Sequence, residues 1–286
     1  MWHTQTAAVT GSGHARQGLP CQDRTGQLTE GGVTAIALAD GAGSQPLSQE
    51  GAAIAVETVC RTLCRRFDQL YAAATPMEMR REVLGEVRQA IRAHAAARGM
   101  EPGQFACTLL AVAVRGDRYL LVHVGDGVIA YQKNGALLAA SRPENGEFAT
   151  TTTFVTSAGA LRRARVLRGE QPGLEGFLLM SDGCEAALYQ KRQGTVAPLV
   201  GRLFQRAELL EPEISGALLQ AVLEQAVAPR TRDDCSLAVM TRQGPAFTPW
   251  ERMQPRQQAA VLGVATGNRN HRRRAVRRYA RAFGAE

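Results

Sequence analysis

The stretch that most constrains the fold is residues 33–44, which read V-T-A-I-A-L-A-D-G-A-G-S. Its first seven residues are apolar apart from Thr34, which is the composition and length of a strand buried on both faces. Asp40 and two glycines follow, and glycines let the backbone turn tightly and approach a ligand. A carboxylate fixed at the mouth of a buried strand is typical of a binding site. The alternative is that Asp40 only caps the next helix.

Acidic residues also mark the ends of other apolar strands. Asp126 follows one such strand and Asp182 follows another, each with glycine beside it. The adjacent Asp233 and Asp234 instead precede an apolar strand. Because neighbouring strands of an antiparallel sheet run in opposite directions, these ends can meet on one edge.

Four or five carboxylates on one edge would repel one another unless a cation neutralises them. Hard divalent ions with oxygen ligands are the natural partners, and the sequence has no histidine or cysteine cluster for zinc. Two Mg²⁺ or Mn²⁺ ions are a common arrangement for hydrolytic phosphoryl transfer. Unrelated turn aspartates remain the alternative for any single residue, but the repeated Asp-Gly after buried strands favours a metal site.

The rest of the chain alternates helical and strand patterns. Apolar residues three and four apart predict amphipathic helices. Residues 107–138 are expected to form an antiparallel meander with tight turns and a glycine-assisted kink at Asp126. Near the N-terminus a short strand at 6–9 leads into a glycine-rich loop that ends at Asp23. His14 in that loop is a candidate ligand, proton donor or bracing residue. The helices are expected at residues 48–67, 77–98, 195–206 and 214–227.

The net charge of +8 is concentrated in the C-terminal segment. Residues 251–286 hold nine of the 34 basic residues and two of the 26 acidic ones, leaving 25 and 24 in the rest of the chain. The tail is therefore strongly basic, whereas the rest of the chain is close to neutral. It is either a solvated or disordered end with some helix, or a contact for an acidic partner, nucleic acid or anionic membrane.

Cysteine usage and hydropathy point to the cytoplasm. The six cysteines are scattered without a C-x-x-C pair, which favours reduced, structural thiols. No apolar run approaches the roughly 20 residues of a membrane-spanning helix, and the N-terminus lacks the layout of a signal peptide.

The ordered set D-G-A-G, G-D-G, S-D-G and D-D-C-S resembles the metal-dependent protein phosphatases of type 2C, and in particular their compact bacterial branch. Three further segments are similar to that branch: G-S-G-H-x-x-x-G-L-P-C-Q-D at 11–23, A-D-G-A-G-S at 39–44 and F-A-C-T at 105–108. The likeness covers roughly residues 5–241. It implies a phosphatase domain at residues 1–242 and an arginine-rich extension at 243–286.

The resemblance implies an α+β fold, a four-layer αββα sandwich of two antiparallel sheets flanked by helices. It also implies two Mn²⁺ or Mg²⁺ ions, a weaker position for a third, and attack of a metal-bridging water on phosphoserine or phosphothreonine. Asp40 would bridge both ions and the Gly41 carbonyl would reach one of them. Asp182 and Asp233 would complete the set of ligands around the other ion. Asp126 would share a third, weaker metal position with Asp182.

Three positions depart from the larger family members. Gln22, before Asp23, replaces a glutamate, so that one outer ligand is neutral. Ala42 replaces a histidine that is a candidate general acid, and Gly18 falls near the place of a phosphate-binding arginine. We therefore assign His14 as the candidate catalytic acid and Arg16 as the candidate substrate-binding residue.

The resemblance implies a protein serine/threonine phosphatase whose partners are a phosphoprotein and a cognate kinase or its targets. The three departures motivate an alternative, a non-catalytic phosphoprotein-binding module derived from a phosphatase. The tail is expected to favour an acidic partner over nucleic acid.

Overall fold

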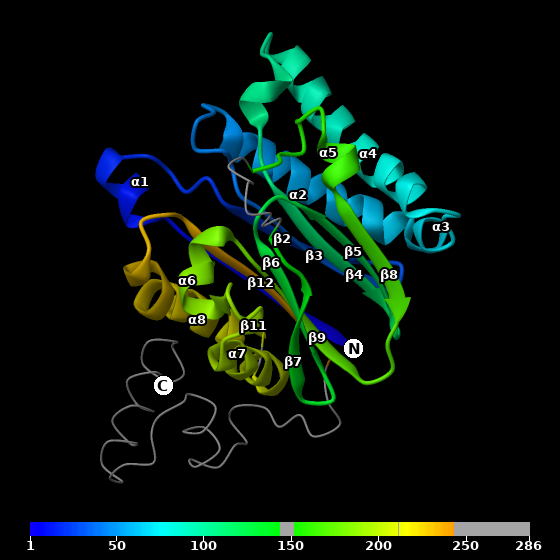
Figure 1. Ribbon diagram of the computed structural model, residues 1–286, viewed down its shortest axis with the longest axis vertical. Helices are drawn as coiled ribbons and strands as arrows, with labels where there is room; N and C mark the ends of the chain where they lie inside the picture. The colour runs from blue at the N-terminus through cyan, green and yellow to red at the C-terminus, as the bar shows by residue number, and fades with distance from the viewer. Residues whose placement is uncertain (144–151, 211, 243–286) are drawn as a thin grey trace.

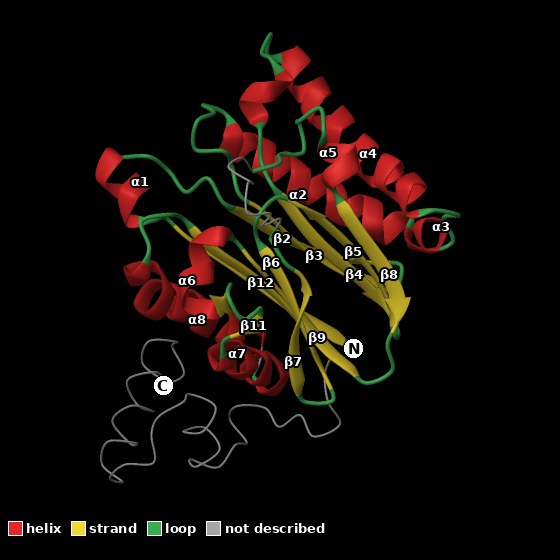
Figure 2. Cartoon of the chain, viewed as in Figure 1, coloured by secondary structure: helices red, strands yellow, loops and turns green. Residues whose placement is uncertain are grey.

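Two antiparallel sheets of five strands each pack face to face, with helices on both outer sides (Figures 1 and 2). The structure is a computed structural model that describes residues 1–143, 152–210 and 212–242. The expected four-layer α+β sandwich is confirmed. In the described residues no helix is both long and apolar enough to cross a membrane.

The strand order of one sheet is β1-β12-β9-β6-β7, and that of the other is β2-β3-β4-β5-β8. The first sheet contains β1 (Trp2–Val9), β6 (Val128–Lys133), β7 (Ala136–Ser141), β9 (Leu174–Met180) and β12 (Cys235–Arg242). The second contains β2 (Arg24–Glu30), β3 (Val33–Ala39), β4 (Leu109–Arg115), β5 (Arg118–Val124) and β8 (Arg165–Glu170). A small separate hairpin pairs β10 (Tyr189–Gln190) with β11 (Thr195–Val196).

Helices cover the outer face of each sheet. The second sheet carries α2 (Ser48–Arg65), α3 (Phe67–Tyr71), α4 (Pro76–Ala97) and α5 (Ala160–Arg163). The first sheet carries α6 (Glu185–Leu188), α7 (Pro198–Leu209) and α8 (Pro212–Val222). The shorter helical pieces are α1 (Ser12–Gln17), η1 (Pro102–Phe105), η2 (Asp182–Cys184), a π-helical turn η3 (Leu223–Val227) and η4 (Ala228–Arg230).

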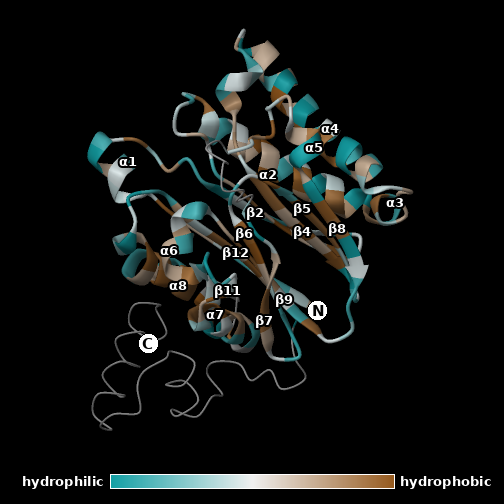
Figure 3. Cartoon of the chain, in the orientation of Figure 1, coloured by the Kyte–Doolittle hydropathy of each residue, from teal (hydrophilic) through white to brown (hydrophobic). Residues whose placement is uncertain are grey.

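The core has three apolar layers because each sheet is covered on both faces. In β3 every residue is buried, and successive side chains alternate between the layers. Ala35 and Ala37 pack toward the helices, whereas Ile36 and Leu38 pack between the sheets. A third cluster fills the space between the first sheet and its helices. Figure 3 shows the corresponding concentration of apolar residues along the strands.

The meander expected at residues 107–138 is wrong as a single sheet. β4 and β5 form a hairpin in the second sheet, whereas β6 and β7 form a hairpin in the first. The chain crosses from one sheet to the other at residues 125–127. Hydrophobic alternation reports that a strand is buried but not which sheet contains it, so the sequence pattern does not reveal this crossing.

Other boundaries also differ from expectation. The loop at 11–23 contains the short helix α1, and the half-exposed edge strand β2 was not predicted. The helix expected at 195–206 begins later, at Pro198, a residue suited to the first turn. The helix expected at 214–227 begins at Pro212 and ends in the π-helical turn. The expectations for residues 243–286 lie outside the described residues.

Candidate metal-binding active site

The four acidic strand ends lie around one cavity of about 330 Å³. Both β3 and β5 run antiparallel to β4, which lies between them, so Asp40 and Asp126 follow at the same end of their sheet. In the other sheet β9 ends where its partner β12 begins, which places Asp182 near Asp233. The cavity is lined by His14, Gln22, Asp40, Gly41, Ala42, Gly43, Thr108, Asp126, Thr152, Phe154, Asp182 and Asp233.

Most of the site residues predicted from the sequence are therefore brought together. Six of the seven predicted metal ligands line the cavity, as does His14. The seventh, Asp23, is buried behind Asp40, where its Oδ2 accepts a hydrogen bond of 2.7 Å from Ser236 Oγ. Arg16 is exposed on α1 and does not line the cavity.

Two threonines of the cavity were not predicted as site residues. Thr108 Oγ1 accepts a hydrogen bond of 2.9 Å from the Asp40 amide, which fixes the backbone where β3 ends. Thr152 Oγ1 donates a hydrogen bond of 2.6 Å to Asp126 Oδ2. Phe154 adds an apolar wall. The F-A-C-T segment was a signal for Thr108, but nothing in the sequence pairs Thr152 with Asp126.

The chain reaches Asp126 through a conformation that requires glycine. Gly125 has a φ of 109°, in the region that side chains rarely adopt. A Cβ atom there would also lie 2.6 Å from Thr108 Cγ2. The crossing between sheets and the placement of Asp126 in the cavity both depend on this glycine.

Burial and mutual repulsion raise the pKa values of the clustered carboxyls. The pKa of Asp40 is raised well above its ordinary value, first by burial and then by Asp23, Asp182 and Asp233. Burial, followed by the charges of Asp126 and Asp233, raises the pKa of Asp182 to about 6. Burial is also the main cause that raises the pKa of Asp23 to about 7. The cluster therefore resists full ionisation unless a cation balances it.

Several buried oxygens at or behind the cavity have no hydrogen-bond partner in the described part of the chain, and oxygen donors of this kind are what a hard cation takes. Gln22 Oε1, Asp23 Oδ1 and Asp182 Oδ1 are buried and accept no hydrogen bond from the described residues. Within those residues, no three His, Cys, Asp or Glu side chains are arranged to hold an ion directly. Mg²⁺ ordinarily keeps several waters and takes only one or two carboxylates, so more widely spaced oxygens suit it.

The cavity lining has acidic and neutral groups but little positive charge. Among the described residues that line it there is no lysine or arginine, and only His14 can become cationic. A phosphate dianion would therefore find no fixed cationic side chain to offset the aspartates. Bound divalent cations would supply the missing charge.

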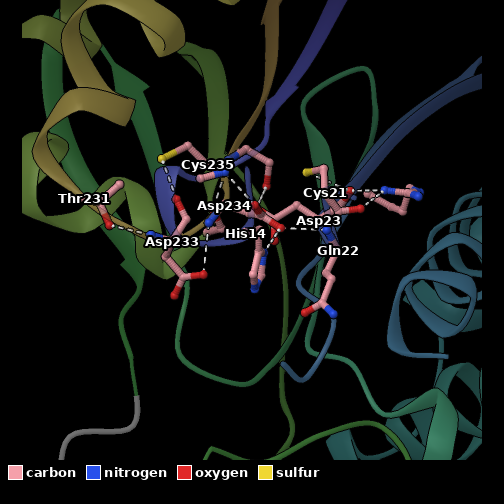
Figure 4. Close-up of polar contacts among 12 residues, drawn as sticks. His14, Cys21, Gln22, Asp23, Thr231, Asp233, Asp234 and Cys235 are labelled. Atoms are coloured by element: carbon pink, nitrogen blue, oxygen red, sulfur yellow. Dashed lines mark hydrogen bonds and ion pairs between the residues drawn. The ribbon is translucent and has the colours of Figure 1, made fainter. Parts of the chain in front are cut away.

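His14 is anchored by Asp234, the neighbour of Asp233 (Figure 4). Asp233 lines the cavity, whereas the carboxylate of Asp234 is 2% exposed and accepts hydrogen bonds from three groups. They are the amides of Gly11 and Gln22 and the ring of His14, at 2.7, 2.6 and 2.9 Å. Figure 4 shows the side chains of His14, Gln22 and Asp233 extending to the same side.

One family model and one curated relative match a large part of the chain. The family model described as Protein phosphatase 2C matches residues 10–226. Serine/threonine-protein phosphatase 3 of Escherichia coli (strain K12) is 28% identical over 167 residues, which is 57% of this chain. The match spans 66% of the length of that relative, slightly less than two thirds.

Solved structures support the fold. A structure described as PppA, a key regulatory component of T6SS in Pseudomonas aeruginosa, matches with a TM-score of 0.56 and 18% identity. That match covers 84% of this chain and 97% of the other. A bacterial serine phosphatase matches with a TM-score of 0.61 and 13% identity, over 86% of this chain and 100% of the other.

Proposed function

The chain belongs to the protein phosphatase 2C family, and we propose that it is a metal-dependent protein serine/threonine phosphatase. The observation that carries the proposal is the convergence of Asp40, Asp126, Asp182 and Asp233 on one cavity. Unpartnered buried oxygens and the scarcity of cationic side chains at this cavity support two Mn²⁺ or Mg²⁺ ions, and a third beside them.

The residues would divide among three ion positions and an outer supporting pair. Asp40 and the Gly41 carbonyl would hold one ion, and Asp40 would share the other with Asp182 and Asp233. Asp126, together with Asp182, would hold a third. Gln22 and Asp23 would support the ions from outside. When bound, the ions would supply positive charge against the phosphate and activate water for attack.

His14 would act on the leaving group. A serine alkoxide must be protonated as it leaves, and a positioned imidazole is a common proton donor near neutral pH. His14 is the one histidine among the described residues that line the cavity. Arg16 lies two residues away on the same short helix and is exposed, a position from which it would contact the phosphoprotein outside the cavity.

An isosteric substitution tests the function. We expect Asp40→Asn to abolish hydrolysis of a phosphoserine peptide, since the amide brings no charge to the ions, while the protein still unfolds cooperatively. Asp117→Asn is the control, because Asp117 lies in the hairpin turn between β4 and β5 and pairs with Arg242. Full activity in EDTA would overturn metal dependence, and full activity of Asp40→Asn would overturn the assignment of the site.

The second candidate function is a non-catalytic phosphoprotein-binding module that uses the same cavity. The neutral Gln22, Ala42 in place of a histidine, and the absence of arginine from the described cavity lining favour it. Binding of a phosphopeptide without turnover, at any Mn²⁺ or Mg²⁺ concentration, would establish this alternative.

The partners would be a phosphoprotein and the serine/threonine kinase that modifies it, or that kinase's other targets. We propose a cytoplasmic setting, which the six free thiols support. The basic extension would bind an acidic partner. Deleting residues 243–286 should therefore leave turnover of a small phosphopeptide unchanged and weaken only the binding of acidic proteins.

A further inference from the structure

Asp234 is a buried carboxylate that the proposed metal set does not use. It follows Asp233 directly in the chain, but it contacts the segment 11–22 instead of lining the cavity. Its Oδ1 accepts from the Gly11 amide, and its Oδ2 accepts from both the Gln22 amide and His14 Nδ1. Since backbone amides can only donate, both oxygens of Asp234 serve as acceptors.

This pattern favours a proton on Nδ1 of the His14 ring. Both oxygens of Asp234 accept from backbone amides, as those of an ionised carboxylate do, and a carboxylate has no hydrogen to give to Nδ1 at 2.9 Å, so Nδ1 supplies the hydrogen of that contact. In the neutral ring the other nitrogen, Nε2, is then an unprotonated acceptor. The ring lines the cavity together with Gln22, Asp40 and Asp233. Nδ1 is engaged by Asp234, so Nε2 is the nitrogen left to act in the cavity.

We propose that Asp234 is the positioning residue that makes His14 the proton donor of this site, and that the pair takes the place of the histidine that Ala42 replaces. This inference rests on the proposed phosphatase function. As water adds to phosphorus, the bond between phosphorus and the serine oxygen breaks, and its electron pair passes to that oxygen. The donor is the imidazolium form of His14, which carries a second proton on Nε2. It gives that Nε2 proton to the serine oxygen and keeps the Nδ1–H hydrogen bond to Asp234. The attacking water releases one proton, which restores the imidazolium, and the products are serine and hydrogen phosphate.

A purely structural role for Asp234 makes different predictions. Two of its three hydrogen bonds hold backbone at both ends of the segment 11–22. If Asp234 only braced that segment, its loss would affect every substrate equally. A proton donor matters most when the leaving group is poor, so loss of the pair should depend on the leaving group.

The first measurement is the tautomer of His14 in the metal-free full chain, read from nitrogen-15 NMR of labelled histidine. The His14 signals are identified by their loss in His14→Ala. We expect the Nδ1–H form in the wild type, whereas an unconstrained neutral histidine favours Nε2–H. In Asp234→Asn no carboxylate charge holds the hydrogen on Nδ1 and the amide can also donate to that nitrogen, so the Nε2–H form should gain population. An Nε2–H form in the wild type would overturn the proposal, even if Asp234→Asn fails to fold.

The second measurement compares a phosphoserine peptide with p-nitrophenyl phosphate, whose leaving group needs little protonation. Asp234→Asn and His14→Ala should each lower kcat/KM for the peptide on the order of 10²-fold, and for the aryl ester less than about 5-fold. The double variant should be no worse than either single one, because the residues act as a unit. Equal losses on both substrates, or additive losses in the double variant, would overturn the pair.

His94→Ala is the matched control for these substitutions. His94 Nε2 contacts Glu50 Oε2 at 3.1 Å, which is the same kind of pair, but His94 does not line the cavity. Its removal should leave the ratio of the two substrates unchanged, and a changed ratio would overturn the reasoning. A wild type that hydrolyses neither substrate would overturn the phosphatase function, whereas the tautomer would still decide whether Asp234 orients His14.

Discussion

Asp182→Asn should stabilise the metal-free protein above neutral pH while removing its activity. Burial and the charges of Asp126 and Asp233 raise the pKa of Asp182 from 3.8 to about 6. Because each pKa unit is worth about 1.4 kcal/mol, ionised Asp182 destabilises the folded, metal-free state by about 3 kcal/mol. An asparagine in the same place carries no charge to bury.

The pH dependence has a definite sign. The folded protein holds a proton on Asp182 that the unfolded chain releases near pH 4, so stability falls as the pH rises from about 4 to above 6. Roughly half of the 3 kcal/mol should be lost between pH 5 and pH 8. The free energy of unfolding of the wild type, measured with urea in EDTA, should therefore fall relative to that of Asp182→Asn over this interval.

Adding metal should reverse the order of the two proteins. An ion at 100 times its dissociation constant stabilises the folded state by about 2.7 kcal/mol, and only the wild type keeps the full ligand set. Asp117→Asn is the control, because a half-exposed surface pair is worth about 0–1 kcal/mol and does not bring carboxylates together. Parallel pH profiles for the wild type and Asp182→Asn in EDTA would refute the electrostatic reasoning.

Three further substitutions test other parts of the structure. Gln22→Glu should lower the Mn²⁺ concentration for half-maximal hydrolysis, since it adds charge where a buried Oε1 has no hydrogen-bond partner; an unchanged or higher requirement would place this side chain outside the metal shell. Gly51→Ala should destabilise by about 1–3 kcal/mol in urea, because its Cβ would lie 2.0 Å from a backbone carbonyl oxygen. Gly85→Ala, in open space on α4, should instead stabilise by up to about 1 kcal/mol, and equal effects would contradict the packing argument. Ser141→Ala removes the 2.8 Å contact of the buried His123 Nδ1 and leaves that nitrogen, among the described residues, with only Arg165 Nη2 at 3.2 Å, so it should cost about 0.5–1.5 kcal/mol in the same assay; no loss would show that the arginine alone satisfies the ring.

The sequence by itself located most of the carboxylates that line the cavity. Asp40, Asp126 and Asp182 could be found because a buried strand leaves a continuous apolar run that a polar site residue must interrupt. The long helices α2 and α4 were also predictable, since their buried side chains recur at helical spacing. These signals are local, and each is complete within about 20 residues.

Tertiary structure alone decided how those local pieces combine. β2 escaped prediction because an edge strand that is half exposed needs no apolar run. The crossing between the sheets at Gly125 could not be predicted, because the hairpins β4–β5 and β6–β7 show the same alternation of side chains in whichever sheet they lie.

The pair Asp233 and Asp234 shows the limit most clearly. Adjacent aspartates before one strand are equivalent in the sequence, yet one lines the cavity and the other accepts hydrogen bonds from Gly11, Gln22 and His14. Those partners lie 212 to 223 residues away in the chain. Successive side chains at a strand end face different surroundings, and only the packing of β1 against β12 determines what those surroundings are.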